Sequence, residues 1–198
     1  MAPKLRLSGS LVILVLALAA MSAGGTAEAA VTCPGQTYVK PFVPWLDPAN
    51  YVLVQNGSLE SSAGWTLSGG AKLVAGNEPW RVNRKSDSRS LSLPSGSSAT
   101  SPPMCVTLFH PTLRFFATNS GLLTTTLRVD MITDVLGLKL TLPIGLVVAG
   151  SWQPTLPFVA LESLASPVIG TVQFRFTPIG PLSGWRIDDV YVDPFKQR

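Results

Sequence analysis

The sequence predicts an all-β fold, a sandwich of about nine or more short antiparallel strands. Gly and Pro are frequent, with 17 of each among 198 residues, and they interrupt the chain every several residues. Between them lie short segments rich in Val, Leu, Thr and Phe, several of which alternate apolar and polar residues. No stretch keeps a helical period of apolar residues over three turns, so the pattern is that of a β-sandwich.

Residues 1–29 are predicted to be a secretory signal peptide. Lys4 and Arg6 precede an unbroken apolar run at residues 11–20, and residues 27–29 (Ala-Glu-Ala) have the small-residue pattern of a cleavage site. An uncleaved membrane anchor is the alternative, but the run is about half of the ~20 residues that span a bilayer. We therefore expect a secreted, extracellular protein with no membrane span after cleavage.

The predicted mature chain has two parts, an irregular lead-in at residues 30–49 and the sandwich at residues 50–198. Prolines recur in the lead-in, and proline argues against a central strand because it lacks the amide proton that a sheet requires. We expect Phe42, Trp45 and Leu46 to pack the lead-in against the sandwich. The mature chain is long enough for one domain with its own hydrophobic core.

Alternation assigns the strands and their faces. In the clearest case Leu127, Val129 and Met131 point one way, while Arg128 and Asp130 point the other. Because such strands are polar on one side, we expect one face on the core and one in water. Strands are predicted at residues 52–54, 65–67, 71–75, 90–93, 113–117, 123–131, 139–142, 146–148, 158–161, 172–177 and 186–192, with loops at 95–103 and 178–184.

Cys33 and Cys105 are the only cysteines. An even pair in an exported chain predicts a structural disulfide. A bridge that closes a loop of this size stabilises the fold by roughly 4 kcal/mol in the chain-entropy description. Two distant cysteines and a single histidine argue against a metal site built from them. A lipid anchor at Cys33 is disfavoured because residues 30–32 make a poor lipobox.

The charge is mildly positive, +4 for the whole chain, and removal of the signal peptide takes away one net positive charge. The densest basic stretch is formed by Arg81, Arg84, Lys85 and Arg89, and Asp87 interrupts it. This stretch is interpreted as a solvated loop, with a patch for an anionic polymer as the alternative. The charge pattern gives no support for nucleic acid as a partner.

The closing segment contains two adjacent carboxylates, Asp188 and Asp189. Strict alternation places Asp188 on the same face as Val190 and Val192, so Asp188 would sit at the inner edge of the sandwich if those valines face the core. A buried carboxylate needs partners, because an unpaired buried charge costs several kcal/mol. Calcium, which takes about six to eight oxygen ligands, is one solution, with Glu60 as a second carboxylate. Hydrogen bonds from loop amides or an arginine are the other.

Two short motifs carry a resemblance to a known superfamily. Residues 56–60 (Asn-Gly-Ser-Leu-Glu) are followed by Gly-Trp at 64–65, and Ile-Asp-Asp-Val stands at 187–190. Apart from Leu in place of the usual Phe in the first motif, they resemble galactose-binding-domain-like jelly rolls, which include many carbohydrate-binding modules of secreted glycoside hydrolases. The resemblance implies a jelly-roll β-sandwich with its first and last strands side by side. It also implies a structural calcium ion (Ca2+) held by Glu60 and Asp188.

Binding of a sugar by stacking requires an exposed aromatic ring. Trp80 and Trp152 are the candidates, because both stand in loops flanked by Gly, Pro or Asn, and Tyr38 is a third. The alternative for each is a loop aromatic that caps the core. Trp65 and Trp185 lie inside the sandwich motifs and are predicted to be buried.

A second candidate surface is the outward polar face of two predicted strands, which could hydrogen-bond sugar hydroxyls. Its members are Arg128, Asp130, Gln173 and Arg175. An ordinary solvated sheet surface is the alternative interpretation.

Catalysis is not predicted. His110 is the only histidine and has no Ser or Asp at a recognisable spacing, and the chain has no phosphate-binding loop and no H-E-x-x-H motif. The leading hypothesis is a secreted, non-catalytic, lectin-like domain that binds a polysaccharide or glycan. The alternative is a cell-envelope structural or protein-interaction sandwich without sugar affinity, and a small secreted hydrolase that uses His110 is a third hypothesis.

Overall fold

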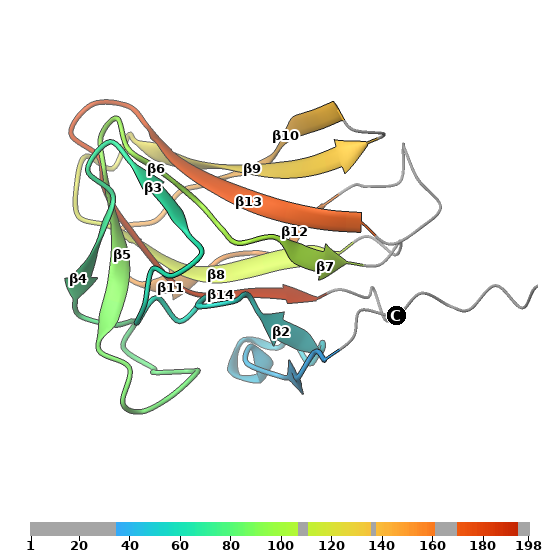
Figure 1. Ribbon diagram of the computed structural model, residues 1–198. Helices are drawn as coiled ribbons and strands as arrows, with labels where there is room; N and C mark the ends of the chain where they lie inside the picture. The colour runs from blue at the N-terminus through green and yellow to red at the C-terminus, as the bar shows by residue number, and fades with distance from the viewer. Residues whose placement is uncertain (1–34, 107–110, 136–137, 161–169, 194–198) are drawn as a thin grey trace, which may run out of the picture. The chain divides into compact units, whose positions relative to one another are not determined.

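The computed structural model describes residues 35–106, 111–135, 138–160 and 170–193. The predicted signal peptide, Cys33 and His110 lie outside these ranges. The described chain forms two antiparallel β-sheets that pack face to face (Figure 1), as the alternating sequence pattern predicts. A short 3-10 helix, η1 (Val43–Trp45), stands in the lead-in. No helix among the described residues is long and apolar enough to cross a membrane.

The first sheet, sheet A, consists of β1 (Tyr38–Val39), β2 (Tyr51–Leu53), β4 (Lys72–Ala75), β5 (Arg89–Pro94), β8 (Thr112–Asn119), β11 (Gln153–Pro154), β12 (Phe158–Val159) and β14 (Gly184–Asp193). The last strand, β14, is central. It pairs with β8 along one edge and with β2 and β5 along the other. β1 and β4 extend the sheet beyond β2 and β5, and β11 and β12 both pair with β8.

The second sheet, sheet B, consists of β3 (Thr66–Ser68), β6 (Ser98–Thr100), β7 (Met104–Val106), β9 (Thr126–Val135), β10 (Leu138–Val147) and β13 (Gly170–Ile179). β13 is central, with β9 on one edge and β6 and β7 on the other. β10 and β3 form the outer strands. Every strand pair in both sheets is antiparallel, so the predicted all-β class is confirmed.

The main core lies between the two sheets and comes from the predicted inward faces. Leu127, Val129 and Met131 are fully buried there, as the alternation along β9 predicts. Both tryptophans of the sandwich motifs are buried too. Leu123 departs from the prediction: it precedes β9 and is exposed. Other core residues are Leu91, Leu93, Leu113, Phe115, Ala117, Val172, Phe174, Phe176, Trp65 and Trp185.

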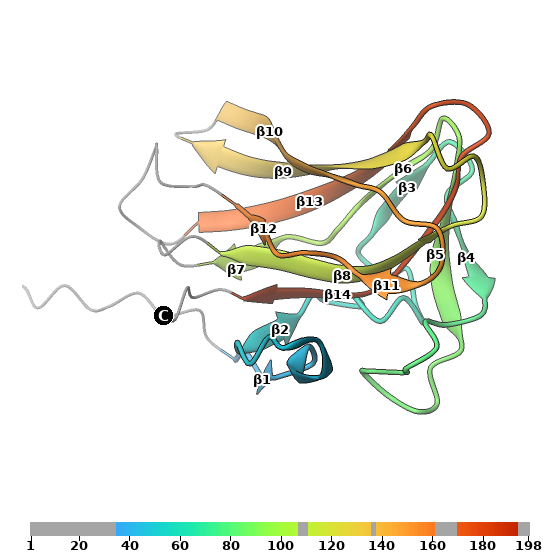
Figure 2. The ribbon, with the colours of Figure 1, turned by 180° about the vertical axis from the view of Figure 1, so that it is seen from behind.

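The lead-in packs on the outer face of sheet A, where it builds a second hydrophobic cluster (Figure 2). Phe42 is fully buried in this cluster and stacks on Phe116 at a centroid distance of 5.6 Å. Tyr51 and Tyr191 complete the buried part of the cluster. Leu46, predicted to pack here, instead follows η1 in a left-handed conformation and is 95% exposed. The prediction for Leu46 is therefore wrong, while that for Phe42 is confirmed.

An ion pair fixes the same lead-in to β8. Asp47 accepts hydrogen bonds from the Arg114 guanidinium and, at 2.7 Å, from the Tyr51 hydroxyl. The Arg114 guanidinium carbon also lies 4.2 Å from the centre of the Phe42 ring. Burial alone would raise the pKa of Asp47, but the bonds from Tyr51 and Arg114 outweigh it and lower that pKa. The lead-in is thus held by both apolar and charged contacts.

The opening segment and the closing strand lie side by side, as the resemblance implied. The amide of Val54 donates to the carbonyl of Val190 at 3.0 Å, and the amide of Val190 donates to the carbonyl of Gly57 at 2.9 Å. A Cβ atom on Gly57 would stand 2.6 Å from the Val190 carbonyl oxygen. Glycine in the first motif therefore permits a backbone contact that a side chain would prevent.

Strict alternation along β14 is a prediction that the structure overturns. The register with β8 shifts after Asp188, and Asp189 adopts a φ of 46°. This β-bulge turns both Ile187 and Val190 into the core. Asp188 consequently pairs with Phe116 on the outer side of sheet A, not at the inner edge of the sandwich. The bulge therefore aims the two carboxylates at the loop outside the sheet.

The start of the lead-in lies beside β7. Gln36 donates from Nε2 to the carbonyl of Cys105 at 3.0 Å, and no cysteine in the described part of the chain is free. Gln36 is three residues after Cys33 in the sequence. Because Cys33 lies outside the described residues, the bridge between Cys33 and Cys105 stays a prediction, one that this contact favours.

Candidate functional site

The site is built around the loop that joins β4 to β5, residues 76–88. Glu78 in this loop is fully buried, and its two carboxylate oxygens accept hydrogen bonds from the amides of Trp80 and Val82, each at 2.5 Å. Arg81, between these two amides, adopts a φ of 52°, which is rare for a residue with a side chain. The loop therefore turns around the Glu78 carboxylate and presents Trp80 and Arg81 outward.

The β14 bulge supports this loop from below. Asp188 accepts from the amide of Glu78 at 3.0 Å, and Asp189 accepts from the amide of Asn83 at 3.1 Å. Burial, reinforced by the charge of Asp189, raises the pKa of Asp188 to about 9. Burial, together with Glu78 and Asp87, raises the pKa of Asp189 to about 7. Near neutral pH Asp188 therefore retains a proton that an ordinary aspartate has lost, and Asp189 is partly protonated.

Glu60, the last residue of the opening motif, holds the far end of the same loop. One of its carboxylate oxygens accepts from the amides of Ser88 and Arg89, at 2.6 and 2.7 Å. The other accepts from the Ser88 hydroxyl at 3.2 Å. Glu60 and Asp188 thus hold opposite ends of the 76–88 loop, and both use the amide partners that the sequence analysis left as the alternative to calcium.

The predicted calcium ligands have other partners in the described chain. A cation held by Glu60 and Asp188 would have to share oxygens that already accept amide hydrogen bonds. Asp189 has one buried carboxylate oxygen without a hydrogen-bond partner. Within the described ranges, no three or more Asp, Glu, His or Cys side chains are arranged to hold a metal ion. The calcium site stays a prediction.

Trp80 lies half-exposed against two other aromatic rings. It is 47% exposed, its ring meets that of Trp45 edge-on at 5.1 Å, and its centroid lies 5.5 Å from that of Phe116. Beside it is an open hollow of about 590 Å³, which we call the Trp80 hollow. The residues that line it are Lys40, Pro41, Pro44, Trp45, Trp80, Arg81 and Val82. The lead-in and the 76–88 loop therefore form the two walls of this hollow.

Trp152 lies on the same outer face of sheet A, next to β11. It packs, partly buried, against the cluster that contains Phe116. The guanidinium carbon of Arg186 lies 5.7 Å from the centre of its ring, and Arg186 is itself fixed by a hydrogen bond to Ser90 at 3.0 Å. Both candidate tryptophans thus border one aromatic cluster, and Trp80 is the more exposed.

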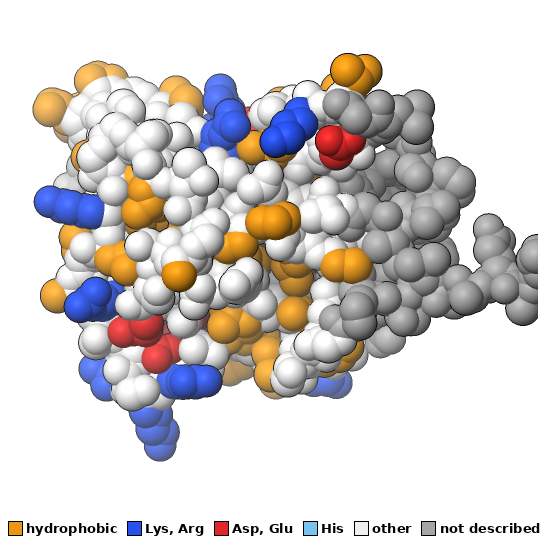
Figure 3. Space-filling view, viewed as in Figure 1, with side chains coloured by type: hydrophobic (Ala, Val, Ile, Leu, Met, Phe, Trp, Pro, Cys, Tyr) orange, Lys and Arg blue, Asp and Glu red, His pale blue; other side chains and the backbone are white. Residues whose placement is uncertain are grey.

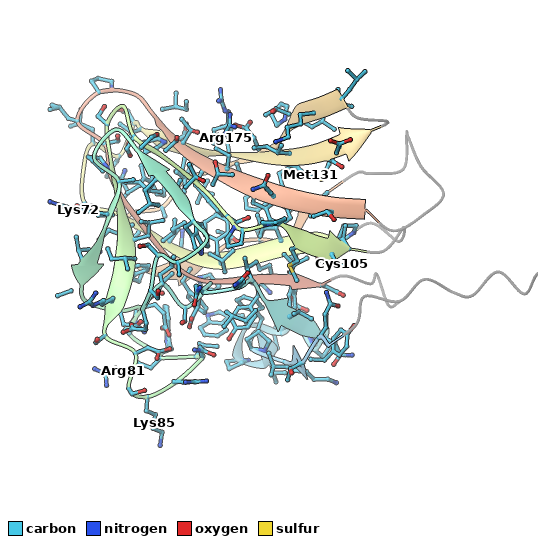
Figure 4. The ribbon with its side chains drawn as sticks, viewed as in Figure 1. Lys72, Arg81, Lys85, Cys105, Met131 and Arg175 are labelled. Atoms are coloured by element: carbon cyan, nitrogen blue, oxygen red, sulfur yellow. The ribbon has the colours of Figure 1, made fainter. Side chains whose placement is uncertain are left out.

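The predicted polar candidates lie on the other side of the sandwich. Arg128 and Arg175 project from β9 and β13 of sheet B, and Figure 4 shows Arg175 on the opposite side from Arg81 and Lys85. Asp130, almost fully buried, pairs with Arg128 at 3.1 Å and lies opposite Arg175 in the sheet. The structure therefore places the predicted ligand residues on different faces of the sandwich. Trp80 and Trp152 lie on the side of sheet A, and Arg128 and Arg175 lie on the side of sheet B.

Two residues that matter for the site were not predicted as part of it. Trp45 was assigned only to packing, yet it forms one wall of the Trp80 hollow. Glu78 was not assigned a role at all, although it stands directly before Pro79-Trp80 in a loop. A lone carboxylate beside a predicted loop tryptophan was the available signal, but its burial depends on the β14 bulge, which alternation does not reveal.

Comparison with known proteins gives matches of fold only. No protein-family profile and no curated protein matches the sequence. Among solved structures, the CBM22-1 and GH10 modules of Clostridium thermocellum endo-1,4-beta-D-xylanase 10B, complexed with xylohexaose, match with a TM-score of 0.51 and 14% identity. That match covers 74% of this chain and 28% of that one.

Two further solved structures match equally well. The CBM22-1–CBM22-2 tandem of Paenibacillus barcinonensis Xyn10C matches with a TM-score of 0.52 and 10% identity, over 75% of this chain and 46% of that one. The arabinose-bound MgGH51 α-L-arabinofuranosidase matches with a TM-score of 0.51 and 17% identity, and the match covers 74% of this chain and 27% of that one. This chain therefore spans less than half the length of each of the three.

These likenesses confirm the predicted fold. The chain forms a jelly-roll β-sandwich similar to those in chains that contain carbohydrate-binding modules. At such low sequence identity the match extends to the fold and not to individual ligand-binding residues. What this chain binds must therefore be argued from its own surface.

Proposed function

We propose that this protein is a secreted, non-catalytic domain that binds carbohydrate through Trp80. The observation that supports it most is the combination of a half-exposed indole with an open hollow beside it, on a loop held by buried carboxylates. The fold, shared with chains that contain carbohydrate-binding modules, is compatible with this role. The predicted signal peptide supports secretion.

The geometry suits stacking of a sugar ring. The indole of Trp80 offers a flat apolar face, and its loop is fixed by hydrogen bonds to Glu78, Asp188 and Asp189. A rigid aromatic ring loses little conformational freedom when a ligand binds, so more of the contact energy is retained. Arg81 adds donors at the rim for hydroxyl or anionic groups of the sugar.

A retention assay tests this proposal. The chain from residue 30 onward is mixed with insoluble polysaccharides and cell-wall fractions, and the fraction retained is compared with that of Trp80→Ala and Trp152→Ala. We expect selective retention that falls about fivefold or more in Trp80→Ala, because the loss of about 1 kcal/mol of ring stacking lowers the affinity by that factor. Leu123→Ala, which removes an exposed apolar side chain that does not line the hollow, is the control.

Absence of retention on every matrix would contradict carbohydrate binding and favour a structural or protein-interaction role. Retention that both tryptophan variants preserve would contradict the assignment of the site to sheet A. The alternative site around Arg128 and Arg175 on sheet B would then be favoured.

A structural calcium ion held by Glu60 and Asp188 is a second, separate proposal. It is supported by the resemblance of the two motifs and by the position of both carboxylates at the ends of one loop. A cation there would rigidify the loop that carries Trp80. A ligand that binds only the native state, at a hundredfold excess over Kd, adds about 3 kcal/mol to the free energy of unfolding. The melting temperature with and without a chelator tests this proposal.

A further inference from the structure

The charges around the Trp80 hollow are of one sign. Lys40 and Arg81 line it from opposite walls, and none of the described residues that line it is acidic. Both side chains are exposed. A neutral sugar stacked on Trp80 would leave these two cationic groups without a matching partner, whereas an anionic substituent would pair with them.

The other exposed charged side chains of the 76–88 loop are also positive. Arg84 and Lys85 are exposed, whereas Glu78 and Asp87, the two acidic residues of the loop, are buried. Asp87 does not face solvent. Its carboxylate accepts a hydrogen bond from the side-chain Nδ2 of Asn83 at 2.9 Å. Burial of Asp87 therefore takes its side chain away from the exposed surface of this basic stretch. Lys and Arg side chains surround a small acidic area at this corner of the molecule (Figure 3).

Arg81 is also held in place. Its guanidinium donates to the carbonyl of Lys85 at 2.8 Å, which leaves its other N–H groups available for a ligand. Its backbone φ of 52° is strained for a residue with a side chain, and such strain is concentrated at functional positions. Arg81 follows Trp80 directly, so the charged group and the stacking ring are carried by the same turn of the loop.

We propose that the Trp80 hollow binds an acidic polysaccharide. A sugar ring stacks on Trp80, while an anionic group of the polymer pairs with Arg81 and Lys40. That group is the carboxylate of a uronic acid or a sulfate ester, which share the chemistry of a charged oxygen acceptor. This inference rests on the proposed function, because it specifies the ligand class of the same site.

The experiment compares polymers that share a backbone and differ in charge. Binding of the chain from residue 30 onward is measured by calorimetry with glucuronoxylan, its carboxyl-reduced form and xylan sulfate, and with polygalacturonate and its carboxyl-reduced form. Inorganic polyphosphate serves as a polyanion that has no ring to stack on Trp80. The variants are Arg81→Gln, Lys40→Gln and the double variant. Lys139→Gln on β10, which removes one charge as each single variant does, is the control.

At least one carboxylated or sulfated polymer should bind about tenfold more tightly than its neutral counterpart, because two exposed ion pairs typically contribute that much together. The preference should fall below about twofold in the double variant and in about 1 M salt, where the screening length is about 3 Å. It should persist in Lys139→Gln. Preference for the carboxylate or for the sulfate identifies the anionic group.

The two proposals fail in different ways. Equal affinity for acidic and neutral polymers would overturn the charge assignment and leave carbohydrate binding intact. A loss of preference in Lys139→Gln as large as in either single variant would also overturn it, since net charge and not the hollow would then be responsible. Equal affinity for polyphosphate would overturn the assignment to a sugar. Binding of none of the polymers would overturn the proposed function itself.

Discussion

At the scale of single residues, Glu78 connects the buried interior to the exposed ring of Trp80. Its carboxylate accepts two amide hydrogen bonds from the turn that displays Trp80 and Arg81. Its own amide is held by Asp188 of the closing strand. The aromatic surface is therefore positioned by carboxylates that themselves face away from solvent.

Removal of the Glu78 carboxylate should loosen this loop. Glu78→Ala leaves two amides without acceptors, and each unsatisfied buried group typically costs about 1–3 kcal/mol. We expect a lower melting temperature and faster trypsin cleavage after Arg81, Arg84 or Lys85. Glu78→Gln, which retains one carbonyl oxygen, should have a smaller effect. Cleavage of Glu78→Ala at the wild-type rate would contradict the role given to this carboxylate.

The raised pKa values of Asp188 and Asp189 predict how stability depends on pH. Their native pKa values, about 9 and about 7, lie above the ordinary 3.8. Between about pH 4 and those values the native state holds protons that the unfolded state has released. The free energy of unfolding should therefore fall as pH rises from 5 to 9, by up to about 1.4 kcal/mol per pH unit for each titrating carboxyl.

Melting curves in chelator across this pH range test the prediction, and a stability that rises with pH would contradict it. The same curves with added calcium test the proposed cation. A bound cation would favour the charged carboxylates and flatten the pH dependence. In Asp188→Asn, calcium should then lose most of its stabilising effect.

At the scale of elements, the contact between the opening segment and β14 depends on Gly57. A Cβ atom there would lie 2.6 Å from the carbonyl oxygen of Val190 and 2.8 Å from that of Val54, both in the backbone. Gly57→Ala should therefore lower the free energy of unfolding by about 1–3 kcal/mol, the typical cost of overpacking. Gly150→Ala, whose nearest atom is a flexible leucine methyl at 3.6 Å, is the control. Equal melting temperatures for both variants would contradict this contact.

The lead-in is an element that hydrophobic packing predicted in part. Phe42 was expected to pack on the sandwich and does so, because a large aromatic among prolines has no other apolar surface to cover. Leu46 was not expected to be exposed, because the left-handed residue that ends η1 has no signature in the sequence. Phe42→Ala should lower the free energy of unfolding by about 3–5 kcal/mol. An unchanged denaturant midpoint would contradict the packing of the lead-in.

The closing strand shows where prediction from alternation fails. The strands whose faces were predicted correctly, such as β9 and β13, keep a regular register with their neighbours over most of their length. β14 contains a bulge, and a single extra residue reverses the face of every side chain beyond it. The carboxylates were recognised from the sequence, but their direction and their amide partners depended on this bulge.

At the scale of the whole domain, the two sheets present different outer surfaces. The outer face of sheet A carries a buried aromatic cluster that the lead-in covers, with the half-exposed Trp80 at its margin. Sheet B presents polar side chains on β9 and β13, where Asp130 is paired with Arg128, and exposed leucines (Leu138, Leu140 and Leu142) on β10. Local patterns predicted the fold and the candidate residues, but they could not show which residues share a face, because that depends on the packing of the two sheets.

The most direct test of the account is a nuclear magnetic resonance titration that follows the indole N–H signals of the five tryptophans. Acidic and neutral xylan fragments are added to the chain from residue 30 onward. The account predicts saturable shifts of the Trp80 signal, with a smaller shift for Trp45, while the buried Trp65 and Trp185 change little. Saturable binding that leaves Trp80 and Trp45 unchanged would contradict the site, and the absence of any shift at saturating sugar would contradict carbohydrate binding.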